Sequence, residues 1–322
     1  MKQSIGAVLS LTRCNALHVC PISSEAVSVI VGPRLGAWKG GWEMAQRRTI
    51  ACGLMGGVIV LGALGASAQL TERHSTKSAL QGTTGRPADG AFHYDLTKGF
   101  DDENQVHSNW DINADWLGVA YRPSNARFGA NGLSLSARKQ RTRISDYTSA
   151  EFQIVGFYGY GRYEVVMQAA EAEGVVSAFF VYSGPDMDDP HDEIDFEILG
   201  RSPRRAQLNY FGDGQKDPGD IQIWFDATRG QHLYAFEWLP DSITWYADNL
   251  QIRRVTAKTG AAPLPRTTGR VMMSVWAANK LSALWAGAPS FEKTTAVFRC
   301  VSHVPMGKTG RQCSDTFKPK GA

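Results

Sequence analysis

His191-Asp-Glu-Ile-Asp-Phe-Glu-Ile-Leu-Gly200 is the stretch that decides the fold, because acidic and apolar residues alternate along it. Successive side chains of a β-strand point to opposite faces. We therefore expect Glu193, Asp195 and Glu197 on one face of a strand, with Ile194 and Phe196 on the other. Like charges in a row destabilise a sheet face, so this pattern indicates a chemical role for the three carboxyl groups.

Paired carboxyl groups on opposite sides of a glycosidic bond are the usual equipment for its hydrolysis. One attacks the anomeric carbon, and the other, with a raised pKa, protonates the leaving oxygen. In an extended strand the Cα atoms of Glu193 and Glu197 lie roughly 13 Å apart, so their side chains must lean inward, with Asp195 sharing a proton between them. An exposed acidic strand and a calcium site stay open as alternatives, although calcium prefers loops with Gly and Asn.

Short runs of strand-like alternation recur after Ala91, separated by turns such as Gly212-Asp-Gly214. The expected strands are 133–137, 162–167, 176–182, 193–199, 206–211, 221–225, 233–238, 242–246 and 270–276. Many short strands without a long amphipathic helix predict an all-β sandwich or barrel. Residues 169–174 are compatible with one helical turn, which is too short to change this class.

Composition narrows the class of partner. The chain has 322 residues, of which 43% are hydrophobic and 20% charged, and its net charge is +3. These values are ordinary for a soluble globular protein, and the charge is too small to argue for nucleic acid. The sequence has no dense Lys/Arg run and no P-loop or C2H2 spacing, so we expect no nucleic-acid partner, no cofactor and no metal.

The N-terminal region has the pattern of an export signal. Residues 1–43 lack periodicity and precede a second methionine, Met44, which we interpret as the true start. Arg47 and Arg48 then precede an apolar run at 50–64, and Ala66-Ser-Ala68 is a cleavage site. This predicts a signal peptide over 44–68, a flexible leader over 69–90 and a secreted or periplasmic protein. An uncleaved anchor is the alternative; after cleavage we expect no membrane contact.

Cysteine usage is consistent with export. Cys14, Cys20 and Cys52 lie in the segment to be removed, which leaves Cys300 and Cys313. A close cysteine pair in an exported chain predicts one disulfide that closes a short loop. Two unpaired thiols are the alternative.

Aromatic residues at turns and strand ends favour a carbohydrate ligand, because flat rings with polar edges suit sugar faces. Those considered are Trp110, Trp116, Tyr158, Tyr160, Tyr182, Trp276 and Trp285. Each alone is more often a core residue, so only the set carries weight.

The acidic strand, taken with Tyr158-Gly-Tyr-Gly-Arg-Tyr-Glu-Val165, Gln207-Leu-Asn-Tyr210 and Tyr234-Ala-Phe-Glu-Trp238, resembles glycoside hydrolase family 16. The resemblance spans about residues 95–302 and is strongest to bacterial lichenases and exopolysaccharide glycanases. It implies a β-jelly-roll sandwich of two antiparallel sheets with a concave substrate cleft and a catalytic domain over 91–306. The Lys- and Gly-rich composition of residues 307–322 separately predicts a frayed tail.

The resemblance also implies roles for individual residues. Glu193 would be the nucleophile, Asp195 the assisting residue and Glu197 the general acid/base of a retaining endo-β-glycanase. The expected substrate contacts are Glu151, Tyr182, His191, Gln207, Asn209, Phe211, Trp276 and Trp285. His191 either caps the loop at 186–190 or tunes the acid/base.

Departures from the lichenase pattern fall at sugar-contacting positions. His191 stands where lichenases have tryptophan, Gln153 where they have arginine, Ser274 where they have asparagine and Phe211 where they have tyrosine. Arg299 aligns with the aspartate of the family's calcium site, so calcium is not expected there. The polymer therefore stays open between a β-1,3-1,4-glucan and a bacterial exopolysaccharide.

Two alternative functions stay open. Plant xyloglucan endotransglycosylases share the uninterrupted acidic motif, so transfer to a sugar acceptor competes with hydrolysis. A carbohydrate-binding module without turnover is the other alternative, although a lectin has no evident use for three closely spaced carboxyl groups. We expect a polysaccharide substrate and a monomer.

Overall fold

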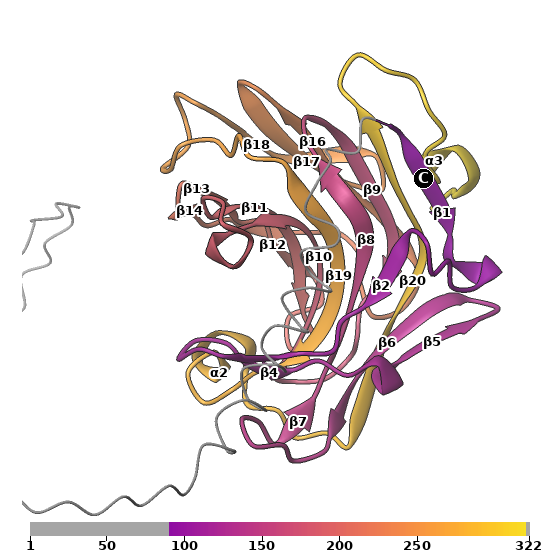
Figure 1. Cartoon of the computed structure of the whole chain (residues 1–322), viewed down its shortest axis with the longest axis vertical. Coiled ribbons are helices and arrows are strands. Elements are labelled where there is room, and N and C mark those ends of the chain that lie inside the picture. Colours follow the sequence, from indigo (N-terminus) through magenta and orange to yellow (C-terminus); the bar gives the residue numbers. More distant parts are fainter. Residues whose placement is uncertain (1–89, 320–322) are drawn as a thin grey trace, which may run out of the picture. The chain divides into compact units, whose positions relative to one another are not determined.

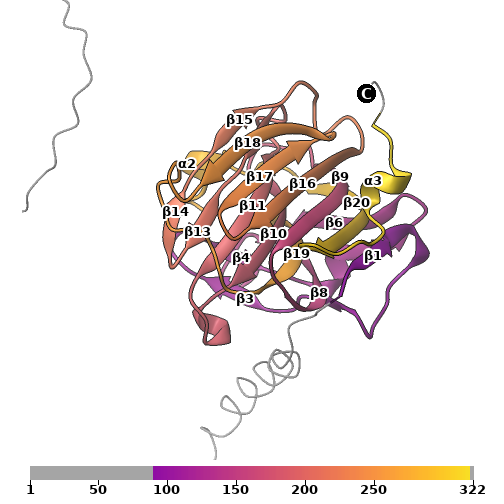
Figure 2. The ribbon, with the colours of Figure 1, turned by 90° about the horizontal axis from the view of Figure 1, so that it is seen from above.

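Two nine-stranded antiparallel sheets form the computed structural model, which describes residues 90–319. The segments expected at 1–43, at 44–68 and, but for residue 90, at 69–90 lie outside the described residues. The two sheets pack face to face, so the fold is the predicted β-jelly-roll sandwich (Figure 1). Seen from above, the strands of both sheets run in a similar direction (Figure 2), as in aligned sheet packing.

The first sheet, called the site sheet here, carries the acidic strand near its middle. Its strands, in spatial order, are β14 (Gln215–Asp217), β13 (Tyr210–Gly212), β11 (Asp192–Leu199), β10 (Val175–Ser183), β19 (Gly269–Ala277), β8 (Ala150–Tyr158) and β2 (Gln105–His107). Two further strands, β12 (Arg205–Gln207) and β15 (Asp220–Gln222), continue it beside β11. This sheet curves, with its free face on the concave side (Figure 1).

The second sheet, called the back sheet, covers the convex side of the site sheet (Figure 1). Its strands are β18 (Leu250–Thr256), β17 (Ser242–Ala247), β16 (His232–Leu239), β9 (Gly161–Gln168), β20 (Lys293–Pro305), β6 (Gly132–Lys139) and β5 (Ala126–Gly129), joined by β1 (Phe92–Asp95) and β7 (Tyr147–Thr148). A separate hairpin contains β3 (Asp111–Asn113) and β4 (Gly118–Ala120). The short helices are η1 (Leu96–Lys98), η2 (Pro123–Asn125), η3 (Pro185–Met187), α2 (Ala283–Ala286) and α3 (Cys313–Thr316).

The core lies between the two sheets, and it orients the acidic strand. Ile194 and Phe196 are fully buried in it, and the Phe196 ring lies 4.8 Å from that of Tyr234 on β16. Trp245 of β17 donates its indole N–H to the backbone carbonyl of Asp195 over 3.0 Å. Because apolar side chains of β11 face the core, its alternate side chains, including Asp195, must face the concave side.

Three details of the predicted element pattern are wrong. The expected strand 206–211 is divided into β12 and β13, because Leu208 instead donates its N–H to Gly219. Only Asp220–Gln222 of the expected strand 221–225 pairs, and residues 169–174 form no helix.

The expectation of a frayed tail from residue 307 is also wrong as far as residue 319. The α3 segment packs against β9, where the backbone N–H of Ser314 donates to the buried Glu164 carboxylate over 2.8 Å. Cys313 forms a disulfide with Cys300 of β20. Buried carboxylates need hydrogen-bond donors, and the C-terminal segment supplies them to Glu164.

Candidate active site

The three acidic residues of β11 share the concave face, as their alternation predicts. Strand pairing places Glu193 between Tyr182 of β10 and Phe211 of β13. It places Glu197 between Ala178 and Gln207. The Glu193 side chain is 19% exposed, whereas Asp195 is almost fully buried. The carboxyl groups are therefore neither scattered nor turned into the core.

Glu193 and Asp195 form one hydrogen-bonded carboxyl pair. Burial raises the pKa of Glu193. Burial and then the charge of Glu193 raise the pKa of Asp195 well above its usual range. The hydrogen bond between them lowers the pKa of Glu193 and raises that of Asp195. The shared proton therefore stays on Asp195, and Glu193 is the first of the pair to ionise.

Glu197 is the third carboxyl group of the row. Burial and then the nearby Asp195 raise the pKa of Glu197 to about 8. Asn209 donates its amide N–H to Glu197 over 3.0 Å and so lowers that pKa slightly. Burial raises the pKa of Glu193 to about 8 as well, so the loss of one proton from these two glutamates leaves one carboxylate and one carboxylic acid on the face. Such a division of roles is what acid-assisted nucleophilic displacement needs.

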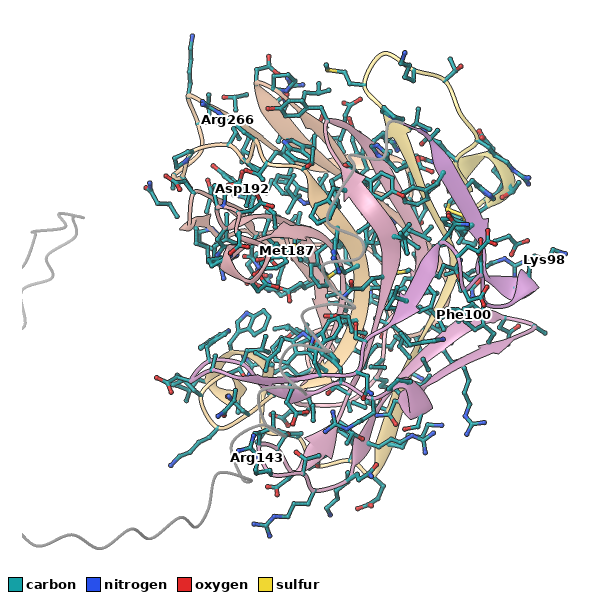
Figure 3. All side chains as sticks on the ribbon, in the orientation of Figure 1. Lys98, Phe100, Arg143, Met187, Asp192 and Arg266 are labelled. Carbon is teal, nitrogen blue, oxygen red and sulfur yellow. A yellow bond between two sulfur atoms is a disulfide. The ribbon has the colours of Figure 1, made fainter. Side chains whose placement is uncertain are left out.

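His191 contacts Glu193, not Glu197. Its Nε2 lies 2.7 Å from a carboxyl oxygen of Glu193, and its ring stacks on Phe211 at 4.4 Å between centroids. The interpretation that His191 tunes the acid/base is therefore wrong as to the partner. Figure 3 labels Asp192, which follows His191 in the chain, and Met187 of the preceding loop.

Lys216 of β14 was not singled out in the sequence. Its ammonium lies 5.4 Å from the ring centroid of Phe211, and its charge lowers the pKa of all three β11 carboxyl groups. The position of Lys216 could have been predicted from the sequence, because the expected turn at Gly212-Asp-Gly214 implies a hairpin. Strand pairing across that turn sets Lys216 opposite Phe211, on the face of the acidic residues.

Glu151 lies on the same concave face but is almost fully buried. It accepts hydrogen bonds from the Ser108 hydroxyl over 2.6 Å and from the Gln153 amide over 3.0 Å. Arg270 of β19 in turn donates to Gln153 over 3.1 Å. Arg270 thus lies beside Gln153, which occupies the position of an arginine in lichenases, although Arg270 comes from a different strand. A direct sugar contact of Glu151 stays a prediction.

Tryptophans extend this face at the end of β11 that bears Glu197. Trp276 pairs with Val176 of β10, and its ring lies 6.1 Å from that of Trp285 on α2. Trp285 lies 6.3 Å from Trp116, which is 46% exposed. The Trp285 indole N–H donates to the Gln207 amide oxygen over 3.4 Å. The three rings of Trp276, Trp285 and Trp116 form a row, called the tryptophan platform here, that extends from Gln207 to the exposed surface.

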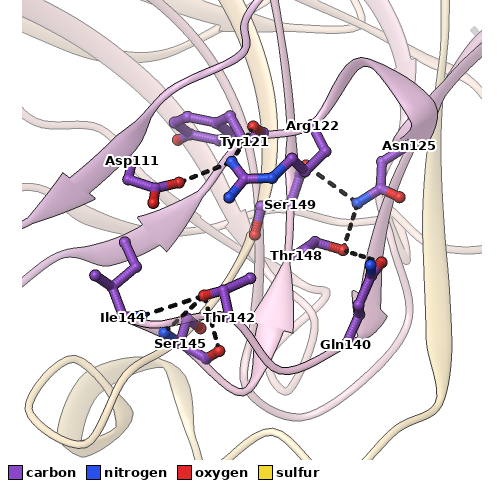
Figure 4. Close-up of polar contacts among 10 residues, drawn as sticks. All are labelled: Asp111, Tyr121, Arg122, Asn125, Gln140, Thr142, Ile144, Ser145, Thr148 and Ser149. Carbon is purple, nitrogen blue, oxygen red and sulfur yellow. Dashed lines mark hydrogen bonds and ion pairs between the residues drawn. The ribbon is translucent and has the colours of Figure 1, made fainter. Parts of the chain in front are cut away.

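The β3–β4 hairpin that carries Trp116 is fixed at its base. Arg122 donates to the Asp111 carboxylate over 2.7 Å and to the Tyr121 carbonyl over 2.7 Å (Figure 4). Asn125 donates to the Thr148 hydroxyl over 2.9 Å (Figure 4). The platform is therefore attached to the sheets by charged and neutral hydrogen bonds.

Two aromatics expected at the sugar face belong to the core instead. Tyr158 is buried against Phe92 and His303, and Tyr160 packs on Trp238. Trp110 packs beside the smaller cluster that contains Trp276. The spacing in the sequence could not distinguish aromatic residues of the core from those of the concave face, since both kinds lie near turns.

Among residues 90–319, one group of side chains lies close enough together to hold a metal ion, His93 with Cys300 and Cys313, but the two cysteines are joined as a disulfide. Arg299, where the calcium ligand was expected to be missing, lies exposed on β20. Within the same range, no helix is both long enough and apolar enough to span a membrane.

Comparison with known proteins points to one family. A family model for glycosyl hydrolases family 16 matches residues 113–295. A β-glucanase of Brevibacillus brevis is 37% identical over 195 residues, which cover 59% of this chain and 72% of the relative. A β-glucanase of Acetivibrio thermocellus is 35% identical over 181 residues, which cover 53% of each chain. The chain thus spans about half the length of that relative.

Solved structures of β-glucanases are also similar to this chain. The β-glucanase of Bacillus licheniformis has a TM-score of 0.61 and 29% identity, covering 67% of this chain and 99% of the other. A prokaryotic β-1,3-1,4-glucanase (lichenase) from a mouse hindgut metagenome has a TM-score of 0.63 and 28% identity, covering 67% and 100%. The Crh5 transglycosylase, at 22% identity and a TM-score of 0.56, shares the fold.

Proposed function

The chain belongs to glycosyl hydrolase family 16, and from this premise and the acidic face of β11 we propose that it is a retaining endo-β-glucanase. The observation that carries the proposal is the placement of three carboxyl groups on one concave face of β11. Asp195 retains the proton that it shares with Glu193, and burial raises the pKa of Glu193 and that of Glu197 to about 8.

In the first step, an ionised oxygen of Glu193 attacks the anomeric carbon. The bond from that carbon to the leaving sugar's oxygen breaks, and the Glu197 proton moves to that oxygen. Asp195, which donates its proton toward Glu193, limits the charge on the pair before attack. A covalent sugar ester of Glu193 and an ionised Glu197 result.

In the second step, Glu197 removes a proton from water as the water oxygen attacks the anomeric carbon. The ester bond to Glu193 breaks, and both carboxyl groups return to their starting protonation. Two displacements at one carbon retain its configuration. If a sugar hydroxyl replaces water, the same residues perform transfer, which is the alternative that the acidic motif leaves open.

A polysaccharide of the β-glucan class is the proposed substrate. Relatives named β-glucanase support it, and the tryptophan platform offers flat rings beyond the reacting carboxyl groups. The contacts proposed for Tyr182, Gln207, Asn209, Phe211, Trp276 and Trp285 all lie on the concave face or its rim. A bacterial exopolysaccharide is the alternative substrate to be tested, because Gln153 and Ser274 differ from the residues that lichenases have at these two positions.

We further propose that the protein acts outside the cytoplasm, as a secreted or periplasmic enzyme. The disulfide between Cys300 and Cys313 supports this location, since disulfides persist in oxidising compartments. N-terminal sequencing of the exported protein tests it directly; cleavage after Ala68 is the expected result.

The test of function uses lichenan, laminarin, xyloglucan and a succinoglycan-type polymer, scored for new reducing ends and for product length. Glu193→Gln should abolish cleavage of every polymer that the wild type cuts. Glu197→Gln should lower polymer cleavage by about 10²–10⁴-fold, yet keep the first step on an aryl glycoside whose leaving group needs no proton.

Each outcome assigns the protein to one class. Products longer than the substrate, formed with an added oligosaccharide acceptor, would indicate transfer. Tight retention of polymer by the wild type without new reducing ends would overturn the enzyme proposal and favour a binding module. Near-full activity of Glu193→Gln would overturn the assigned roles.

A further inference from the structure

His191 touches the carboxyl group that the proposed reaction uses as its nucleophile. The residue lies two positions before Glu193, so both side chains project from the same side of the chain. The imidazole Nε2 lies 2.7 Å from a carboxyl oxygen of Glu193. Asp195 contacts the same carboxyl group, so Glu193 lies between two partners.

The imidazole ring is held by aromatic neighbours from two strands. It stacks on Phe211 of β13 at 4.4 Å with an interplanar angle of 20°. The Tyr182 ring of β10 meets it edge-on at 5.6 Å. The carbonyl of His191 accepts the N–H of Gly214 over 2.9 Å. These contacts leave Nε2 directed at Glu193.

Asp192 fixes the chain between His191 and Glu193. One of its carboxylate oxygens accepts the backbone N–H of Asp213 over 2.8 Å. The other accepts the N–H groups of Arg266 and Thr267 over 2.7 and 2.8 Å; Figure 3 labels Asp192 and Arg266 on the same side of the domain. Two loops thus converge on one buried carboxylate immediately before the nucleophile.

Charge decides which atom holds the proton. Burial lowers the pKa of His191, while Asp192 and Asp186 raise it. The other titratable groups that face the ring are Glu193, Tyr182 and, across Phe211, Lys216. A carboxylate can only accept a hydrogen bond, so a neutral imidazole beside an ionised Glu193 must carry its proton on Nε2.

We propose that His191 is a positioning residue for Glu193: its Nε2–H holds one carboxylate oxygen, which leaves the other aimed at the anomeric carbon. This inference rests on the proposed function. A donor from His191 and another from Asp195 stabilise the ionised nucleophile without adding a net charge. The contact orients Glu193 before attack, so its loss should lower kcat more than it changes KM.

The test compares His191→Phe, which keeps an aromatic ring, with His191→Gln, which keeps a donor. His232 offers a matched control, because its ring also stacks on a phenylalanine, Phe225, at 3.6 Å and contacts a carboxylate, Asp248, at 2.7 Å. His232 lies on β16 of the back sheet, so His232→Phe should change stability but not kcat.

His191→Phe should lower kcat about ten- to a hundredfold, as expected for a lost hydrogen bond to a charged group, with KM nearly unchanged. Its acidic limb of kcat/KM should move to higher pH, because Glu193 loses a donor. His191→Gln should restore most of kcat. An unchanged kcat with a raised KM would overturn the proposal and make His191 a sugar contact.

A second measurement does not depend on any substrate. Nitrogen NMR of the wild type should show the neutral imidazole of His191 protonated on Nε2 at a pH where Glu193 is ionised, above its pKa of about 8. Carbon NMR should show Glu193 titrating at higher pH in His191→Phe than in the wild type. If these signals appear and no polymer is cleaved, the proposed function fails while the contact stands; if they are absent, the positioning proposal fails whatever the activity.

Discussion

The side-chain amide of Asn209 donates to the carboxyl group of Glu197 over 3.0 Å, although the two residues belong to different parts of the site sheet. Asn209 occupies the break between β12 and β13, and its own carbonyl accepts the N–H of Asp195 over 2.9 Å. One residue thus contacts two members of the acidic row. Asn209 therefore joins the segment between β12 and β13 to the acidic strand by both its backbone and its side chain.

Removing this donor should change the pH dependence of activity. The hydrogen bond from Asn209 lowers the pKa of Glu197, so Asn209→Ala should raise that pKa and extend the alkaline limb of kcat/KM to higher pH. At neutral pH, kcat should fall about tenfold, because one hydrogen bond no longer orients the acid. Kinetics across pH 5–10 measure both effects, and an alkaline limb that moves to lower pH would contradict this account.

Much of this arrangement follows from local sequence pattern. Alternation alone predicts that Glu193 and Glu197 lie on one face, because Ile194 and Phe196 must be buried on the other. It also locates most central strands, such as β9 and β16. Alternation with a period of two is a local property of the chain, so it can be recognised without knowing which strands pair.

Other features depend on pairing between distant segments, which a local pattern does not reveal. β8 was missed although its first five residues alternate apolar and polar, whereas the start of β20 alternates in burial but not in residue type. The partner of His191 is decided by the two-residue offset to Glu193 together with the ring of Phe211, brought by β13. Tyr158 and Trp276 look alike in sequence, yet the first packs in the core and the second on the concave side.

The exposed end of the tryptophan platform should matter for long substrates. Trp116→Ala should raise KM for polymer severalfold, since an aromatic contact stabilises by about 0.5–1.5 kcal/mol, while kcat for a short aryl glycoside stays unchanged. Trp224 is a matched control, because it is 50% exposed and its ring packs on Phe225 instead of the platform. Equal effects of Trp116→Ala and Trp224→Ala would show that the platform has no part in binding.

The raised pKa of Glu197 also has a consequence for stability. In the folded protein burial raises this pKa to about 8, against 4.5 for a free glutamate. Between those two values the folded state holds a proton that the unfolded state has released. The free energy of unfolding therefore decreases as pH rises through this window, and the wild type at alkaline pH carries a buried charge that opposes folding.

Glu197→Gln should remove this penalty, because glutamine keeps the shape and the contact with Asn209 but never ionises. At pH 5 its thermal midpoint should be close to that of the wild type, and at pH 9 the variant should be more stable by up to about 5 kcal/mol, given about 1.4 kcal/mol per unit of pKa between 4.5 and about 8. Thermal unfolding at both pH values measures the difference. Glu103→Gln, at an exposed position, should give the same small change at both, and an equal gain for Glu197→Gln at pH 5 and pH 9 would show that its charge is not what opposes folding.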